Sequence, residues 1–209
     1  MAKSQASTGA GDTEITLGLL NAVEKNSDLT QRSASRDLGI ALGLTNAYLR
    51  RCVSKGLIKV RQIPRKRYAY YLTPKGFAEK SRLTAEYLSS SFNFFRKARS
   101  QLSELFGLCE QRNWRRIALW GSSELAEIAT LCAREHGVVL VGIQDSKSKA
   151  DTFAGLKVSR LPGQLGTVDA VILTETRSPQ AAFDEAAANF DPERILTPNL
   201  LRLTHGRNR

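Results

Sequence analysis

The sequence predicts two folded parts of different class, an α+β domain at the N-terminus and a small α/β domain with a parallel sheet at the C-terminus, joined by a long helix. Three observations lead to this prediction. The first part of the chain reads as helices followed by one hairpin, residues 77–112 contain no proline, and from Arg115 onward short apolar strands alternate with helices. The chain has 209 residues, 42% of them apolar, which is enough for two cores.

The N-terminal part begins with small and polar residues. Residues 1–12 read MAKSQASTGAGD and are expected to form a disordered leader. Asp12 or Thr13 can cap a first helix that runs to about Asn26, because apolar residues recur there at helical spacing.

Two further helices and a hairpin follow. Thr30 can cap a second helix that ends at Gly39, and a third helix is expected from about Gly43 to Lys55. Beyond it, LIKVRQI and YAYYLT read as two strands joined by the turn PRKR. Helix, short turn, helix and hairpin is the element order of a winged helix-turn-helix domain, which we therefore expect over residues 13–76.

The positive charge of the chain gathers in this front part. The formal net charge is +11, and residues 1–112 hold 19 Lys and Arg against 9 Asp and Glu, whereas residues 113–209 hold 12 against 11. From Arg50 to Arg67 there are eight basic residues and no acid. Such charges repel one another, and phosphates would relieve that repulsion. The expected partner is double-stranded DNA, with the third helix in the major groove and the hairpin as the wing.

The third helix supplies the surface expected to read DNA. Placed at 100° per residue, its core-facing stripe consists of Leu42, Leu49, Cys52 and Val53. The residues expected to meet base edges or thymine methyl groups are Leu44, Ala47 and Tyr48. The full set expected to contact DNA is Gln31, Arg32, Leu44, Thr45, Asn46, Ala47, Tyr48, Arg50, Arg51, Lys55, Arg61, Arg65, Lys66 and Arg67.

Residues 13–90 resemble a known family of regulators. The matching stretches are TQR, the junction KGLIKV and the run LTPKGFAEKSRLTAEYL. Here the chain resembles the MarR-type winged helix-turn-helix regulators associated with exopolysaccharide genes. The resemblance implies a sequence-specific transcriptional regulator. The chain departs from that family at Leu44, Ala47 and the turn PRKR, so its operator does not follow from the resemblance.

A long helix over residues 77–112 is expected to link the two domains. Apolar residues recur along it at alternating three- and four-residue steps, which is the seam of a coiled coil. The seam positions are Ala85, Leu88, Phe92, Phe95, Arg99, Leu102, Phe106 and Cys109. These residues either pack against their own domains or form a dimer contact. A homodimer is expected because helix-turn-helix proteins commonly bind two half-sites.

Residues 113–209 predict a small Rossmann-like domain. Its strands are RRIALWG, VVLVGIQD, DAVILTE and RILTP, and two helices lie between them. Ligands of such sheets bind at the carboxyl ends of the strands. Gly121, Ser123 and Ala126 stand where a dinucleotide fingerprint has glycine or alanine, and Asp145 ends the second strand. The candidate nucleotide-binding residues are Gly121, Ser122, Ser123, Glu124 and Asp145.

Two of these residues argue against ordinary NAD binding. Ser123 adds a side chain where the backbone should approach a pyrophosphate, and Glu124 places a negative charge at the helix N-terminus. Residues 115–200 also resemble the small Rossmann-like domains attached to sugar methyltransferases and sugar acetyltransferases, which implies a nucleotide or nucleotide-sugar effector. The order of the two domains is similar to that of the Rex redox repressors, whose intact glycine fingerprint is missing here.

Several classes of protein are not expected. Three cysteines that are far apart, and two histidines, His136 and His205, with no partner nearby in sequence, indicate neither a disulfide framework nor a metal site. No cluster of catalytic residues is visible, so an enzyme is not expected. No apolar run approaches 18 residues, which predicts a cytoplasmic protein with no membrane span.

The favoured function is that of a dimeric transcriptional regulator, expected to be a repressor, which a nucleotide or nucleotide sugar could control. Two alternatives stay open. One is a nucleotide-binding or nucleotide-sugar-binding metabolic enzyme with an attached DNA-binding domain. The other is an architectural DNA binder that takes no ligand and has little preference for any operator.

Overall fold

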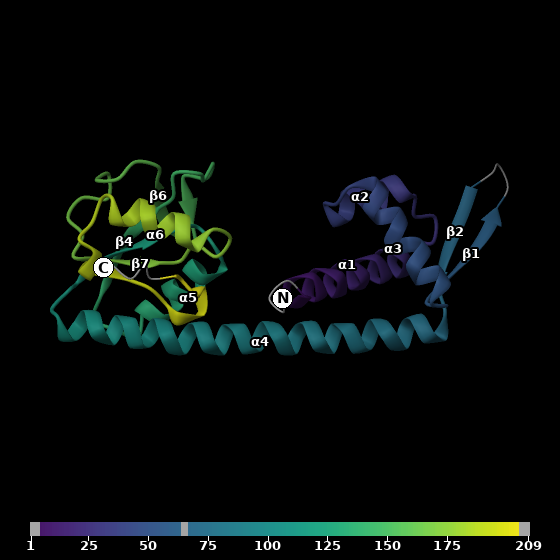
Figure 1. Cartoon of the computed structure of the whole chain (residues 1–209), viewed down its shortest axis with the longest axis horizontal. Helices are drawn as coiled ribbons and strands as arrows, with labels where there is room; N and C mark the ends of the chain where they lie inside the picture. Colours follow the sequence, from purple (N-terminus) through teal and green to yellow (C-terminus); the bar gives the residue numbers. More distant parts are fainter. Residues whose placement is uncertain (1–4, 64–66, 205–209) are drawn as a thin grey trace. The chain divides into compact units, whose positions relative to one another are not determined.

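The computed structural model describes residues 5–63 and 67–204, and the chain divides into two compact units, Met1–Ser91 and Phe92–Arg209 (Figure 1). The division falls inside helix α4 (Pro74–Gln111), so that each unit contains part of this helix. Each unit has its own hydrophobic core.

The first unit contains three helices and a hairpin ahead of α4. Its elements are α1 (Gln5–Lys25), α2 (Gln31–Leu38), α3 (Leu42–Ser54), β1 (Ile58–Ile63) and β2 (Arg67–Leu72). The two strands pair antiparallel, with Ile58 opposite Leu72 and Ile63 opposite Arg67. The structure thus has the predicted arrangement, a helix-turn-helix followed by a hairpin.

The ends of α2 follow from local chemistry. The Thr30 hydroxyl accepts a hydrogen bond from the Ser33 amide, and the Ser33 hydroxyl accepts one from the Thr30 amide, so two free donors at the helix start are satisfied. Gly39 adopts a left-handed backbone with φ of 62°, which ends the helix without the cost of a Cβ atom.

Helix α1 begins earlier than expected. The sequence suggests a disordered leader up to residue 12, but α1 starts at Gln5, and Asp12 lies within it. Asp12 accepts hydrogen bonds from Tyr48 and Arg51 of α3. These contacts stabilise a turn of α1 that the local sequence alone does not predict to be helical.

The second unit is an α/β domain around a six-stranded sheet in the order β5-β6-β4-β3-β7-β8. The strands are β3 (Arg116–Trp120), β4 (Val139–Gln144), β5 (Thr152–Phe153), β6 (Leu156–Ser159), β7 (Ala170–Leu173) and β8 (Ile195–Leu196). All neighbours are parallel except β5 and β6. The five parallel strands β3, β4, β6, β7 and β8 can be numbered 1 to 5 along the chain. They then lie side by side in the order 3-2-1-4-5, which is found in doubly wound α/β sheets.

Two helices connect the strands of this sheet. Helix α5 (Glu124–Ala133) leads from β3 to β4, and α6 (Pro179–Ala187) leads from β7 to β8. Because these crossovers run outward from the centre in opposite directions, right-handed connections place α5 and α6 on opposite faces. Strands β5 and β6 were missed in the sequence, since they are short and only the end of β6 is buried.

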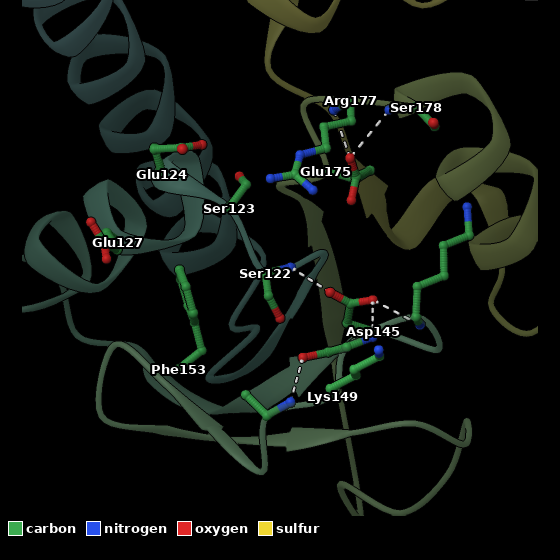
Figure 2. Close-up of a pocket in the computed structure, with 13 residues that line it drawn as sticks. Ser122, Ser123, Glu124, Glu127, Asp145, Lys149, Phe153, Glu175, Arg177 and Ser178 are labelled. Carbon is green, nitrogen blue, oxygen red and sulfur yellow. Dashed lines mark hydrogen bonds between the residues drawn. The ribbon is translucent and has the colours of Figure 1, made fainter. Parts of the chain in front are cut away.

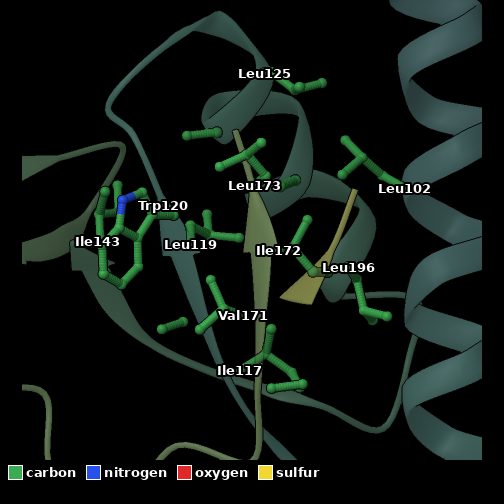
Figure 3. Packing of buried hydrophobic residues seen from close by; sticks show 14 of the residues in the cluster. Leu102, Ile117, Leu119, Trp120, Leu125, Ile143, Val171, Ile172, Leu173 and Leu196 are labelled. Atoms are coloured by element: carbon green, nitrogen blue, oxygen red, sulfur yellow. The ribbon is translucent and has the colours of Figure 1, made fainter. Parts of the chain in front are cut away.

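The core of the second unit is formed by β3, β7 and the helices that cover them. All four residues of β7 are buried, as are Leu119 of β3 and Leu125 of α5. Figure 3 shows Leu102 reaching from α4 toward Leu196 and Ile172. Three of the eight seam positions, Leu102, Phe106 and Cys109, are completely buried here.

The earlier part of the seam behaves differently. Every residue from 85 to 97 is exposed, and this segment carries five large apolar side chains. They are Tyr87, Leu88, Phe92, Phe94 and Phe95. The C-terminal part of α4 therefore packs on its own sheet, whereas its middle part is exposed in the part of the chain that the structure describes.

Candidate functional site

The exposed face of α3 is one part of a candidate DNA-binding surface. Leu44, Ala47, Arg50 and Lys55 are exposed, and Asn46 is half-buried. Among the residues that the structure describes, no carboxylate pairs with Arg50, Lys55 or Arg61. These cations are therefore free to meet an external anion.

Two predicted contact residues on α3 point into the core instead. Thr45 is fully buried and donates a hydrogen bond to the Ala41 carbonyl at 3.2 Å. Tyr48 is 9% exposed and donates to Asp12. The buried face of α3 is therefore rotated relative to the predicted stripe of Leu42, Leu49, Cys52 and Val53. Leu42, at the helix start, is 40% exposed. Tyr48 and Thr45 are thus corrected from base-contacting to structural residues.

Arg51 is exposed but already has a partner. Its Nη1 lies 3.0 Å from Oδ2 of Asp12. The Tyr48 hydrogen bond, and then Arg51, lower the pKa of Asp12. Asp12 is therefore an ionised partner at neutral pH. The sequence suggests that Arg51 is an unpaired cation, whereas in the structure it is paired with Asp12.

The start of α2 offers a second place for phosphate. Gln31 and Arg32 are exposed in the first turn, where the helix dipole favours negative charge. In the wing, Arg61 is exposed on β1. Arg65, Lys66 and the side chain of Arg67, which the sequence also assigns to DNA, lie outside the described residues.

A second candidate site is a pocket of about 500 Å³ at the carboxyl ends of β3, β4 and β7 (Figure 2). The predicted residues Ser122, Ser123, Glu124 and Asp145 all line it. Gly121 precedes them with φ of 107°, and a Cβ there would lie 2.6 Å from the Glu175 backbone. Glycine at this position is therefore needed for the close approach of β3 and the segment that follows β7.

Asp145 fastens the turns around the pocket. Its Oδ2 accepts a hydrogen bond from the Ser122 amide at 3.0 Å, and its Oδ1 accepts from the amides of Lys147 and Ser148 at 3.0 and 3.1 Å (Figure 2). A carboxylate has about four acceptor positions, so roughly one is left for a ligand. In the structure Asp145 acts first as a support for the pocket wall.

The start of α5 is capped from within the chain. The Ser123 hydroxyl accepts a hydrogen bond from the Leu125 amide at 3.1 Å and donates to the Thr174 carbonyl. Ser123 therefore satisfies one of the donors that a phosphate at this helix end would use. Other charged side chains of the pocket are available, since Lys147, Lys149 and Arg177 have no side-chain ion pair among the described residues.

Several pocket residues were not anticipated from the sequence. They are Glu127, Lys147, Ser148, Lys149, Ala150, Phe153, Glu175, Arg177 and Ser178. Most of them come shortly after β4 or β7. Their position after an apolar strand was the feature of the sequence from which they could have been predicted. Next to the pocket, Gln144 is 2% exposed and its Nε2 has no hydrogen-bond partner.

Comparison with known proteins supports the nature of the first unit. Residues 12–59 match a family described as winged helix-turn-helix DNA-binding. The chain thus carries a winged helix-turn-helix DNA-binding domain. A search of curated proteins found no similar sequence. None of the described helices is long and apolar enough to cross a membrane.

Among solved structures, the chain is similar to MepR, a transcription regulator of the Staphylococcus aureus multidrug efflux pump MepA. The identity is 23% and the TM-score 0.34, over 40% of this chain and 61% of MepR. The chain thus matches about three fifths of the MepR length.

Longer matches are to methyltransferases. Human N-acetylserotonin methyltransferase matches 94% of this chain and 81% of its own, at 14% identity and a TM-score of 0.28. The O-methyltransferase NcsB1 of neocarzinostatin biosynthesis matches 93% and 83%, at 12% identity and a TM-score of 0.33. These matches contradict the expectation that the chain is not an enzyme, although likeness at this level assigns no reaction to it.

Proposed function

We propose that this protein is a transcriptional regulator that binds DNA as a homodimer through α3, the start of α2 and the wing. The observation that carries this proposal is the set of exposed cations without carboxylate partners, Arg50, Lys55 and Arg61, in a winged helix-turn-helix domain. Each such cation that meets a phosphate releases condensed counterions, which favours binding.

The exposed residues of α3 suggest how sequence is read. Leu44, Ala47 and Asn46 lie on or beside the exposed face, where apolar side chains suit thymine methyl groups and an amide suits adenine. Basic side chains beside them would hold the backbone and set the register of the helix in the groove. Repression, rather than activation, follows if the operator overlaps a promoter.

The homodimer is supported by the exposed segment 85–97 of α4. Five large apolar side chains in fewer than four helical turns form a patch that a soluble monomer would rarely leave open to water. A second copy of the same helix presents the same patch, so pairing of two copies would bury both patches. Two DNA-binding units would then be available for two half-sites.

Control by a ligand is proposed for the pocket of the α/β unit, read as a Rossmann-like domain. Its strand order and the position of the pocket at the carboxyl ends of β3, β4 and β7 support a nucleotide or nucleotide sugar. Phosphates would contact the available cations Lys147, Lys149 and Arg177, since Ser123 already satisfies one amide donor at the start of α5. Ligand control requires different affinities for the two DNA-binding states.

A footprinting experiment tests the regulator. The full chain is added to the DNA upstream of its own gene and to a shuffled DNA of the same length, with and without NAD(H), ATP, nucleotide sugars or S-adenosylmethionine. Protection of two half-sites about one helical turn apart is expected, and at least one ligand should change the affinity. Equal affinity for both DNAs at physiological salt would support the architectural alternative instead.

A further inference from the structure

Three polar side chains of the second unit form a continuous hydrogen-bonded series that shares no residue with the pocket described above. Ser103 Oγ lies 2.8 Å from His136 Nε2, and His136 Nδ1 lies 3.0 Å from Glu110 Oε2. Ser103 and Glu110 come from α4, and His136 follows α5. Serine, histidine and carboxylate in this order is the arrangement that activates a hydroxyl as a nucleophile.

The tautomer of His136 follows from its two hydrogen-bond partners. The backbone amide of Gly137 donates to Glu110 Oε1 at 2.6 Å, and this bond, with that from His136, lowers the pKa of Glu110. An ionised carboxylate can only accept, so Nδ1 of His136 carries the proton. In the neutral ring Nε2 then has a free lone pair, which accepts the hydrogen bond of the Ser103 hydroxyl.

The histidine is held in its orientation by packing as well. Its ring lies against that of Phe106, with 5.8 Å between the ring centres, and its side chain is 16% exposed. Glu110 is fixed by the Gly137 amide at the same time. The base and its orienting carboxylate therefore need little rearrangement before a reaction.

The helix surface beside Ser103 has room for a reacting group. Arg99 and Gly107 stand four residues before and after Ser103, so all three share one face of α4. A Cβ on Gly107 would meet no atom within 4 Å. Arg99 is held by an ion pair of 2.7 Å with Glu135, the residue before His136.

We propose that Ser103 is the nucleophile of a second, catalytic site that hydrolyses small activated carboxylic esters. Ser103 Oγ bonds to the acyl carbon while its proton passes to His136 Nε2. The bond from that carbon to the leaving oxygen then breaks, and the leaving oxygen takes the proton. Water attacks the acyl-serine by the same route, releasing the carboxylic acid and restoring the Ser103 hydroxyl. This proposal is independent of DNA binding.

The experiment uses the full chain with p-nitrophenyl acetate and with a fluorophosphonate probe that forms a stable bond to activated serines. One adduct on Ser103, located by peptide mapping, and release of p-nitrophenol are the expected results. Ser103→Ala should abolish both. His136→Gln should lower both rates by roughly 10²- to 10⁴-fold, the usual contribution of a general base.

Matched variants separate catalysis from a structural role. Ser100, one turn earlier on α4, donates a hydrogen bond to Glu104 and does not belong to the Ser103–His136–Glu110 series, so Ser100→Ala should leave both rates unchanged. Ser103→Cys keeps a nucleophile and should react rapidly with iodoacetamide, whereas Cys52, Cys109 and Cys132 are buried. An unlabelled Ser103, or equal labelling in folded His136→Gln, overturns the proposal. Should His136→Gln fail to fold, slow alkylation of Ser103→Cys decides against it.

Discussion

Arg51 of α3 and Asp12 of α1 form an ion pair of 3.0 Å, and the same carboxylate accepts the hydrogen bond of Tyr48. One acid thus joins two helices of the DNA-binding unit and removes one cation from those free to bind phosphate. The contact also explains why α1 continues through residues that, taken alone, read as a disordered leader.

Removing this acid should change both stability and DNA binding. Asp12→Ala leaves the Tyr48 hydroxyl without its acceptor and frees Arg51, so the free energy of unfolding should fall while affinity for random DNA at low salt should rise. Urea unfolding and fluorescence anisotropy measure the two effects. Tyr48→Phe is the control, since it should lower stability without raising DNA affinity.

The same contact predicts a pH dependence. Because the pKa of Asp12 is lower in the folded state than in the unfolded one, its contribution is complete above the unfolded value near 3.8 and is lost as the pH falls through the lower folded value. The urea midpoint of the wild type should therefore drop more steeply below about pH 4 than that of Asp12→Asn. Parallel curves would show that the carboxylate charge contributes nothing.

Arg50 should contribute to DNA affinity without regard to sequence. Arg50→Ala removes one phosphate contact, so the slope of log K against log salt should become shallower by roughly 0.9. Filter binding over a series of salt concentrations gives the slope. Arg134, an exposed cation of the α/β unit, provides the control, and an equal effect of Arg134→Ala would place the DNA elsewhere.

The exposed apolar residues of α4 should hold the dimer. Replacing Phe92 and Phe95 together with Lys removes two aromatic anchors and introduces like charges, so the dissociation constant should rise on the order of 100-fold. Sedimentation equilibrium measures it. Phe77 is comparably exposed, at 48%, but lies outside segment 85–97, and Phe77→Lys should leave the association unchanged. A wild type that sediments as a monomer contradicts this arrangement.

Gly121 should be far less replaceable than a glycine with positive φ and open space around it, such as Gly155. Gly121→Ala meets both a strained backbone and the Glu175 main chain at 2.6 Å, and should cost roughly 2 to 4 kcal/mol of unfolding free energy. Gly155 has φ of 78° with open space around it, so Gly155→Ala should cost only about 1 kcal/mol. Chemical unfolding compares them, and similar losses would contradict the close approach.

Local chemistry in the sequence predicted much of the architecture. The caps at Thr30 and Gly39, the hairpin and the alternation of strands and helices depend on neighbours along the chain, and all are present in the structure. The pocket residues Ser122 and Asp145 could be found because each directly follows a buried strand. Strands β5 and β6 escaped notice because they are too short to show a pattern.

What the tertiary structure alone decided are the contacts between residues distant along the chain. The sequence determined that there is a cationic winged helix domain and a parallel sheet, because caps, spacing and charge are local. It did not determine that Tyr48 turns inward to Asp12, or that Ser103 and Glu110 meet His136. Those pairs are 36, 33 and 26 residues apart, and only the packing of whole helices brings them within hydrogen-bond distance.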